Sequence, residues 1–144
     1  MGRKLVFRTK SKIENIYSIE SQIIETAGKL GYDEDACFSL RLALDEALVN
    51  AIIHGNGNAE DKEIMVIAEC DEEKFTVTVC DEGDGFDCTK LYDPRQEPYL
   101  HNCNGRGVFL IRQFTHNVFF NEKGNEITFS VNRNQPISVL QAAN

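Results

Sequence analysis

The chain contains few prolines, no long hydrophobic run and no secretory signal. Its 144 residues include 3 prolines, and 42% of them are hydrophobic, a composition that is ordinary for a globular protein of about one domain. No apolar run approaches the roughly 20 residues that a membrane-spanning helix needs. We therefore expect a single domain over residues 1–144 with no membrane partner, in which residues 134–144 form a peripheral tail.

Closely spaced cysteines are also absent. The five cysteines are an odd number, and no two of them form a C-x-x-C pair, so neither a zinc site nor a disulfide framework is indicated. The amino terminus, MGRKLVFRTK, lacks the apolar core and the small-residue cleavage site of a secreted protein. These absences predict a cytoplasmic protein, because free thiols persist in a reducing compartment.

Positive charge is scarce. The chain has 15 Lys and Arg against 23 Asp and Glu, which gives a formal net charge of −8. Nucleic-acid binding requires a basic face that neutralises phosphates, so this balance argues against nucleic acid as the main partner. It does not exclude a nucleotide, since a metal ion and local backbone N–H groups can offset the charge of a small phosphate ligand.

The first part of the chain has the pattern of a strand followed by two helices. Residues 3–8 alternate as in an edge strand. Helical spacing then begins at Ser11 or Ser18 and ends at Gly31, and Asp33 begins a second helix.

The second part of the chain is rich in β-branched residues that group into two hairpins. The four expected strands are residues 63–70, 74–80, 117–121 and 125–132. An irregular loop over residues 81–104 and a helix over residues 107–114 separate the hairpins. The order predicts an α+β fold: a two-layer sandwich with a mixed, mostly antiparallel sheet and helices on one face.

The helix expected over residues 36–54 has a broad apolar face, which should pack on the sheet. At about 100° per residue this face consists of Cys37, Leu40, Leu44, Ala47, Leu48 and Ala51. Arg41 and Asp45, four residues apart, should form an exposed ion pair.

A polar row lies elsewhere on the same helix, within the stretch DEALVNAIIHGNGN. Glu46, Asn50 and His54 follow one another in steps of four, with apolar residues on both sides of the row. Burying an unpaired carboxylate is costly, so Glu46 requires a ligand, a metal, a water or a hydrogen-bond donor nearby. A satisfied structural hydrogen bond is the alternative, and the helix alone does not decide between them.

The stretch VCDEGDGFD follows the second strand of the first hairpin. The apolar residues of that strand should face the helices, and the alternation places Asp81 on the same face. A carboxylate there needs a donor, such as an exocyclic amine. Gly83 and Gly85 would let the backbone turn sharply and approach a ligand, although D-x-G-x-G alone often marks only a turn.

The stretch NGRGVFLIRQF begins a helix with two glycines, Gly105 and Gly107. Such a beginning leaves backbone N–H groups free to bind phosphate, and the helix dipole favours the anion. A plain helix cap is the alternative.

Taken in order, these three elements resemble the GHKL superfamily of ATPases, whose ATP-binding domain has the Bergerat fold. Within it, DEALVNAIIHG and GRGVFLIRQF are most similar to the bacterial anti-sigma factor serine/threonine kinases. The resemblance covers about residues 5–132. It implies a protein kinase that uses ATP and Mg²⁺.

The resemblance also implies a role for each motif residue. Glu46 would be the catalytic base or would orient the attacking hydroxyl, Asn50 would ligate Mg²⁺, and Asp81 would accept a hydrogen bond from the adenine amino group. The residues lining the base pocket and contacting phosphate would be Gly83, Gly85, Gly105, Arg106 and Gly107, and residues 88–104 would form a lid. The implied partners are a STAS-domain anti-anti-sigma protein as substrate, a sigma factor, and a second copy of the chain in a homodimer.

The sequence departs from the family pattern at two places. Cys103 stands where family kinases often carry an arginine, a charge that Arg106 would have to supply. Asn125 stands where a threonine often lies near adenine, and Thr128 is either its substitute or an ordinary strand residue. Two functions therefore remain: a kinase, favoured by Glu46, and a nucleotide-gated regulator that binds its partner without phosphorylating it, favoured by Cys103.

Overall fold

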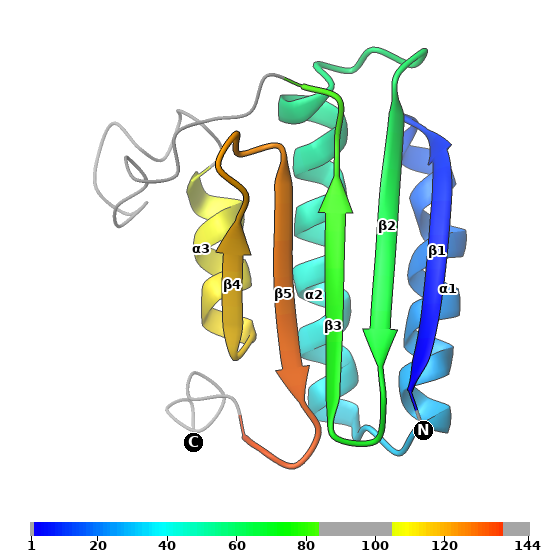
Figure 1. Ribbon diagram of the computed structural model, residues 1–144, viewed down its shortest axis with the longest axis vertical. Helices are drawn as coiled ribbons and strands as arrows, with labels where there is room; N and C mark the ends of the chain where they lie inside the picture. Colours follow the sequence, from blue (N-terminus) through cyan, green and yellow to red (C-terminus); the bar gives the residue numbers. More distant parts are fainter. Residues whose placement is uncertain (1, 84–104, 137–144) are drawn as a thin grey trace.

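The computed structural model describes residues 2–83 and 105–136 of the chain. Within them, three α-helices cover one face of a five-stranded sheet (Figure 1). The helices are α1 (Ile13–Lys29), α2 (Glu34–Asn50) and α3 (Gly105–Phe114). The strands are β1 (Arg3–Lys10), β2 (Glu63–Cys70), β3 (Lys74–Cys80), β4 (Asn117–Phe120) and β5 (Glu126–Asn132).

The strands are ordered β1-β2-β3-β5-β4, so β3 is central and β1 and β4 are the edges. All four neighbouring pairs among the described strands are antiparallel. The expected α+β sandwich with helices on one face is confirmed, and so is the expected edge strand at the start of the chain. None of the described helices has the length and apolar character needed to cross a membrane.

The beginnings of the two long helices differ from each other. Lys12 is the N-cap of α1 and makes no side-chain capping hydrogen bond, so the expectation that Ser11 or Ser18 begins this helix is wrong. Ser11 instead donates its backbone N–H to the Lys62 carbonyl at 3.0 Å. Asp33 caps α2 as expected, and its carboxylate accepts the Ala36 N–H at 2.8 Å.

The second helix extends to Gly55, but its last turn is not α-helical. Residues Ala51–Gly55 form a π-helical turn, η1. Its geometry is defined by the Asn56 N–H, which donates to the Ala51 carbonyl at 2.7 Å. Because a π turn takes up more residues than an α turn, His54 does not continue the row of Glu46 and Asn50, and its side chain is exposed.

The core lies between the sheet and α2, the central helix. Buried apolar side chains come from both layers: Leu40, Leu44, Leu48 and Ile52 from the helix, and Phe75, Val77 and Phe129 from the sheet. The prediction of an exposed ion pair between Arg41 and Asp45 is wrong. Arg41 instead points its Nε at Glu20 on α1, 4.0 Å from the carboxylate Oε2, so these charges join two helices.

No described helix covers the other face of the sheet, which we call the open face (Figure 1). The Thr78 and Thr128 hydroxyl groups lie on it, in neighbouring strands, 2.9 Å apart. Thr128 is therefore a strand residue on the open face and does not approach the helix side. Two large apolar side chains are exposed on the edge strands, Val6 (58%) and Phe119 (62%).

Candidate functional site

Several segments that are distant in sequence meet at one end of the sandwich, the upper end in Figure 1. They are the end of α2 with η1, the end of β3, the turn from β4 to β5, and the beginning of α3. The sequence placed its three motifs on the first, second and fourth of these segments. Asn50 and Asp81 therefore belong to the same end of the molecule.

The closest approach in this region is between Gly55 and Asp81. A Cβ atom on Gly55 would lie 2.7 Å from the Asp81 Oδ1 and closer still to Oδ2, so a side chain there would overlap the carboxylate. This places the Asp81 carboxylate on the helix face of the sheet, as the alternation of β3 predicted. Only a glycine at the end of η1 leaves room for it.

Gly83 completes the same contact. Its N–H donates to the Asp81 Oδ1 at 2.7 Å, and a Cβ on this residue would overlap the Gly55 carbonyl. The chain therefore folds back on the end of η1 directly after β3. Gly85, which was expected to line the same pocket, lies outside the described residues.

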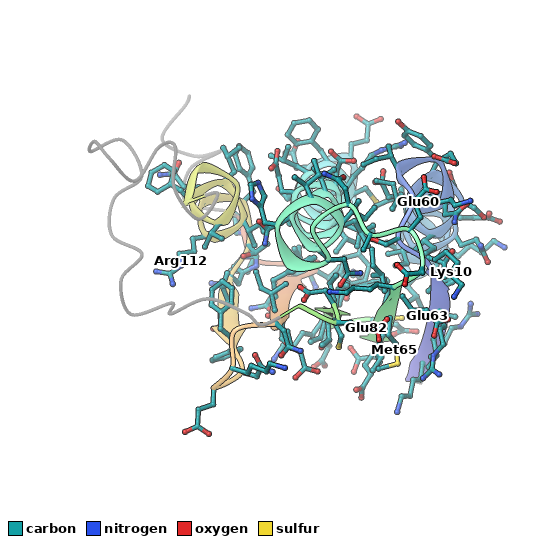
Figure 2. All side chains as sticks on the ribbon, turned by 90° about the horizontal axis from the view of Figure 1, so that it is seen from above. Lys10, Glu60, Glu63, Met65, Glu82 and Arg112 are labelled. Atoms are coloured by element: carbon teal, nitrogen blue, oxygen red, sulfur yellow. The ribbon has the colours of Figure 1, made fainter. Side chains whose placement is uncertain are left out.

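Asn56 is a residue of this region that the motifs did not reveal. Its side chain is only 2% exposed. Its Oδ1 accepts the Glu82 N–H at 2.7 Å, and its Nδ2 donates to the Glu63 carbonyl at 3.1 Å. Glu82 in turn accepts the Glu63 N–H, and Figure 2 shows these two glutamates side by side at this end of the sheet. A signal was available in the sequence: Asn56 directly follows the glycine that ends the helix.

Asn125 holds Asp81 from the opposite side. The Asp81 N–H donates to the Asn125 carbonyl at 3.0 Å, and the Asn125 Nδ2 donates to the Asp81 carbonyl at 3.1 Å. The residue that replaces the family's threonine is thus in direct contact with the backbone of the aspartate.

The environment of Asp81 raises the pKa of its carboxyl group. The main cause is burial, and the Gly83 N–H and the positive charges of Lys123 and Lys62 oppose it. A half-buried carboxylate with a fixed orientation is suited to accept a hydrogen bond from a ligand.

Glu46 and Asn50 lie one turn apart on the same side of α2, and both are half-buried. Burial is also the main reason that the pKa of Glu46 is raised, with a smaller contribution from the neighbouring negative charge of Asp45. A raised pKa makes a carboxylate a better proton acceptor near neutral pH.

The glycines of the third motif lie in the first turn of α3, which begins at Gly105. Gly107 is buried there. The backbone N–H groups of this turn have no partners within the helix, which is the arrangement that binds phosphate. The expected helix over residues 107–114 is confirmed, and in the structure it begins two residues earlier, at Gly105.

A metal at this end of the molecule would have one hard ligand on α2. Asn50 carries an amide oxygen, which is a ligand that Mg²⁺ accepts together with waters and phosphate oxygens. Among the described residues, no group of three or more His, Cys, Asp or Glu side chains could hold a metal ion.

Comparison with known proteins agrees with this geometry. Residues 9–131 match the family described as the histidine kinase-like ATPase domain. The chain belongs to this family. The chain is also similar to curated proteins, of which one is named a serine-protein kinase and another an anti-sigma factor.

Serine-protein kinase RsbW from Listeria monocytogenes serovar 1/2a is 27% identical to the domain over 124 residues, which make up 82% of this chain and 79% of the relative. Anti-sigma F factor from Clostridium beijerinckii is 31% identical over 84 residues, or 58% of this chain and 59% of the relative. Among solved structures, the RsbU and RsbW domains of Rv1364c from Mycobacterium tuberculosis match with a TM-score of 0.63 at 15% identity, which shows a shared fold. That match covers 93% of this chain and 33% of the other, so the domain spans about a third of that protein's length.

Proposed function

We propose that the chain is an anti-sigma protein kinase that transfers the γ-phosphoryl group of ATP to a serine or threonine of a STAS-domain anti-anti-sigma protein. One observation carries the proposal: the Asp81 carboxylate packs against Gly55, at the end of the helix that bears Glu46 and Asn50. An acceptor for adenine and the groups needed for phosphate chemistry then share one end of the molecule.

In this proposal, Asp81 recognises the base. Its Oδ1 already accepts the Gly83 N–H, which fixes the plane of the carboxylate, and its remaining lone pairs accept the adenine amino group. Gly83 lets the chain pack on the Gly55 carbonyl beside the proposed base pocket, and Gly85 would be a further residue of that pocket. Guanine carries a carbonyl oxygen at the corresponding position. That oxygen would face the Asp81 carboxylate, which offers no hydrogen to donate, so guanine should bind more weakly.

The phosphates lie between α2 and α3. Backbone N–H groups of Gly105, Arg106 and Gly107 bind phosphate oxygens at the positive end of α3, and Asn50 supplies the protein ligand to Mg²⁺. When bound, Mg²⁺ neutralises the charge that develops on the phosphate oxygens during transfer.

Glu46 acts on the acceptor hydroxyl. The hydroxyl oxygen attacks the γ-phosphorus, the bond to the β–γ bridging oxygen breaks, and ADP leaves. Glu46 accepts the proton of the hydroxyl, so the products are ADP and a phosphorylated partner. Its raised pKa supports this role, because the carboxylate must hold a proton during transfer.

The relatives' names support the proposed partners. One is named a serine-protein kinase and another an anti-sigma factor. We propose that the chain also binds a sigma factor, acts in the cytoplasm and forms a homodimer.

Two variants test the base pocket and the catalytic step separately. D81N replaces the acceptor with an amide, so we expect at least about a tenfold rise in the Kd for Mg²⁺-ATP, measured with labelled nucleotide. E46Q should leave that Kd unchanged and lower the rate of phosphorylation of a cognate STAS protein by about 100-fold or more.

D35N is the matched control for the loss of charge, because Asp35 lies at the opposite end of α2. It should change neither measurement. Equal ATP binding by wild type and D81N would remove Asp81 from the base pocket, and undiminished phosphorylation by E46Q would remove Glu46 from the catalytic role.

A second function is favoured by one residue, Cys103, which replaces an arginine that family kinases often carry. In that case the chain is a nucleotide-gated regulator that holds its partner without phosphorylating it. The phosphorylation assay, combined with a measurement of partner binding with and without ATP, distinguishes the two functions. If wild type binds the STAS protein or sigma factor only with ATP and transfers no phosphate, the chain is the regulator.

A further inference from the structure

We propose that Asn56 and Asn125 form an amide clamp that orients Asp81 and thereby sets the preference for a purine with a 6-amino group. The proposal rests on the proposed role of Asp81 in adenine recognition. Neither asparagine is a catalytic residue, since each acts through the aspartate, and we call both positioning residues.

Asn56 connects three segments of the site. Its own N–H donates to the Ala51 carbonyl and closes η1, its Oδ1 accepts the Glu82 N–H, and its Nδ2 donates to the Glu63 carbonyl. The residue is almost fully buried, with 2% of its surface exposed. The residue after Asp81 is thus tied to the end of the helix and to the beginning of β2.

Asn125 connects to Asp81 itself. It bonds both backbone groups of the aspartate, the N–H through its carbonyl and the C=O through its Nδ2. Asn121 donates from its Nδ2 to the Asn125 Oδ1 at 2.7 Å, which fixes which end of the amide faces Asp81. The turn from β4 to β5 therefore holds the aspartate from the β5 side of β3, whereas Asn56 bonds to Glu63 on the β2 side.

Both asparagines use both ends of the amide, as donor and as acceptor. Each side chain must present an acceptor to an N–H group and a donor to a carbonyl group, and only Asn or Gln does both. An aspartate at position 125 would turn an oxygen toward the Asp81 carbonyl. An aspartate at position 56 would keep the acceptor for the Glu82 N–H but would turn its other oxygen toward the Glu63 carbonyl, away from Asp81 itself.

The clamp determines where the carboxylate can point. Asp81 is held through its own N–H and C=O and through the N–H of the next residue, and its side chain is confined between Gly55 and Gly83. If one side of the clamp is removed, the segment after β3 gains freedom and the carboxylate samples orientations that do not meet an amino group. Contacts to ribose and phosphates do not depend on this orientation.

The test compares ATP with purine riboside triphosphate, which lacks the 6-amino group, in binding to the full chain with Mg²⁺. Wild type should prefer ATP by at least about tenfold, the value of one hydrogen bond to a charged group. N56A and N125A should reduce this preference to about twofold, as D81N does, while the Kd for purine riboside triphosphate changes little. N117A, an asparagine at the far end of β4, is the control and should keep the preference.

Carboxylate variants test which bond of each amide matters, with thermal unfolding followed by circular dichroism to show that each variant is folded. N56D retains the oxygen that accepts the Glu82 N–H and should keep more of the ATP preference than N125D, in which an oxygen faces the Asp81 carbonyl. Preserved ATP preference in N56A and N125A, or equal losses of affinity for both nucleotides, would overturn the clamp. A wild type with no ATP preference would instead show that the base-pocket assignment has failed, and the clamp with it.

Discussion

Arg41 on α2 and Glu20 on α1 form an ion pair across the helix layer, with 4.0 Å between Nε and Oε2. The glutamate is buried, and only 2% of it is exposed. Burial, followed by a hydrogen bond with Asp45 and its negative charge, raises the pKa of Glu20 to about 7, and Arg41 opposes this shift. A carboxyl group in the helix layer is therefore expected to titrate near neutral pH.

This titration should be visible in the stability of the protein. Because the pKa of Glu20 is raised from 4.5 to about 7, the folded chain holds a proton that the unfolded chain has released in this range. The stabilisation from Glu20 is fully present below about pH 4.5 and is lost as pH rises through about 7. E20Q, which stays neutral, should therefore gain in Tm relative to wild type between pH 5 and 8, by about 3 °C or more.

Thermal unfolding followed by circular dichroism at a series of pH values would measure this difference. E25Q, on the exposed side of α1, is the matched control and should follow the wild-type profile. A constant difference between E20Q and wild type across the range would contradict the assignment.

The contact between Gly55 and Asp81 leads to a second prediction. In G55A the added methyl group overlaps the carboxylate, so Asp81 must move from its position against η1. We expect the Kd for Mg²⁺-ATP to rise by at least about tenfold, measured by titration calorimetry. G28A is the control: a Cβ there meets no atom within 4 Å, and alanine in a helix is expected to stabilise by up to about 1 kcal/mol. Unchanged nucleotide binding by G55A would show that the carboxylate does not need this position.

A third prediction concerns the proposed homodimer. The exposed apolar side chains of Val6 and Phe119 lie on the two edge strands of the open sheet face. If a second copy covers this region, V6K and F119K should shift the chain from dimer to monomer in sedimentation velocity, without loss of the fold. A wild type that sediments as a monomer at tens of micromolar would rule out a dimer of useful affinity.

Much of the fold could be predicted because local rules and packing agree. The sequence predicts Asp33 as a helix cap and the structure confirms it, and the alternation of β3 correctly predicts that Asp81 lies on the helix face. Both hairpins were predicted to within a residue at each end.

What could not be predicted depends on contacts between elements. The partner of Arg41 was predicted to be Asp45 in its own helix, but the ion pair forms with Glu20, a buried glutamate on α1. The π turn ends where Gly55 meets Asp81, 26 residues later in the chain, and Asn56 bonds to residues that follow it by 7 and 26 positions. Helical periodicity carries no information on such contacts.

The π turn also makes the site sensitive to the length of the chain. The turn Ala51–Gly55 carries Gly55 to the Asp81 carboxylate. A deletion between Asn50 and Gly55 would put a different residue against that carboxylate, and any side chain there would overlap it. The spacing of this segment is therefore a constraint in its own right, beside the burial of Ala51 and Ile52.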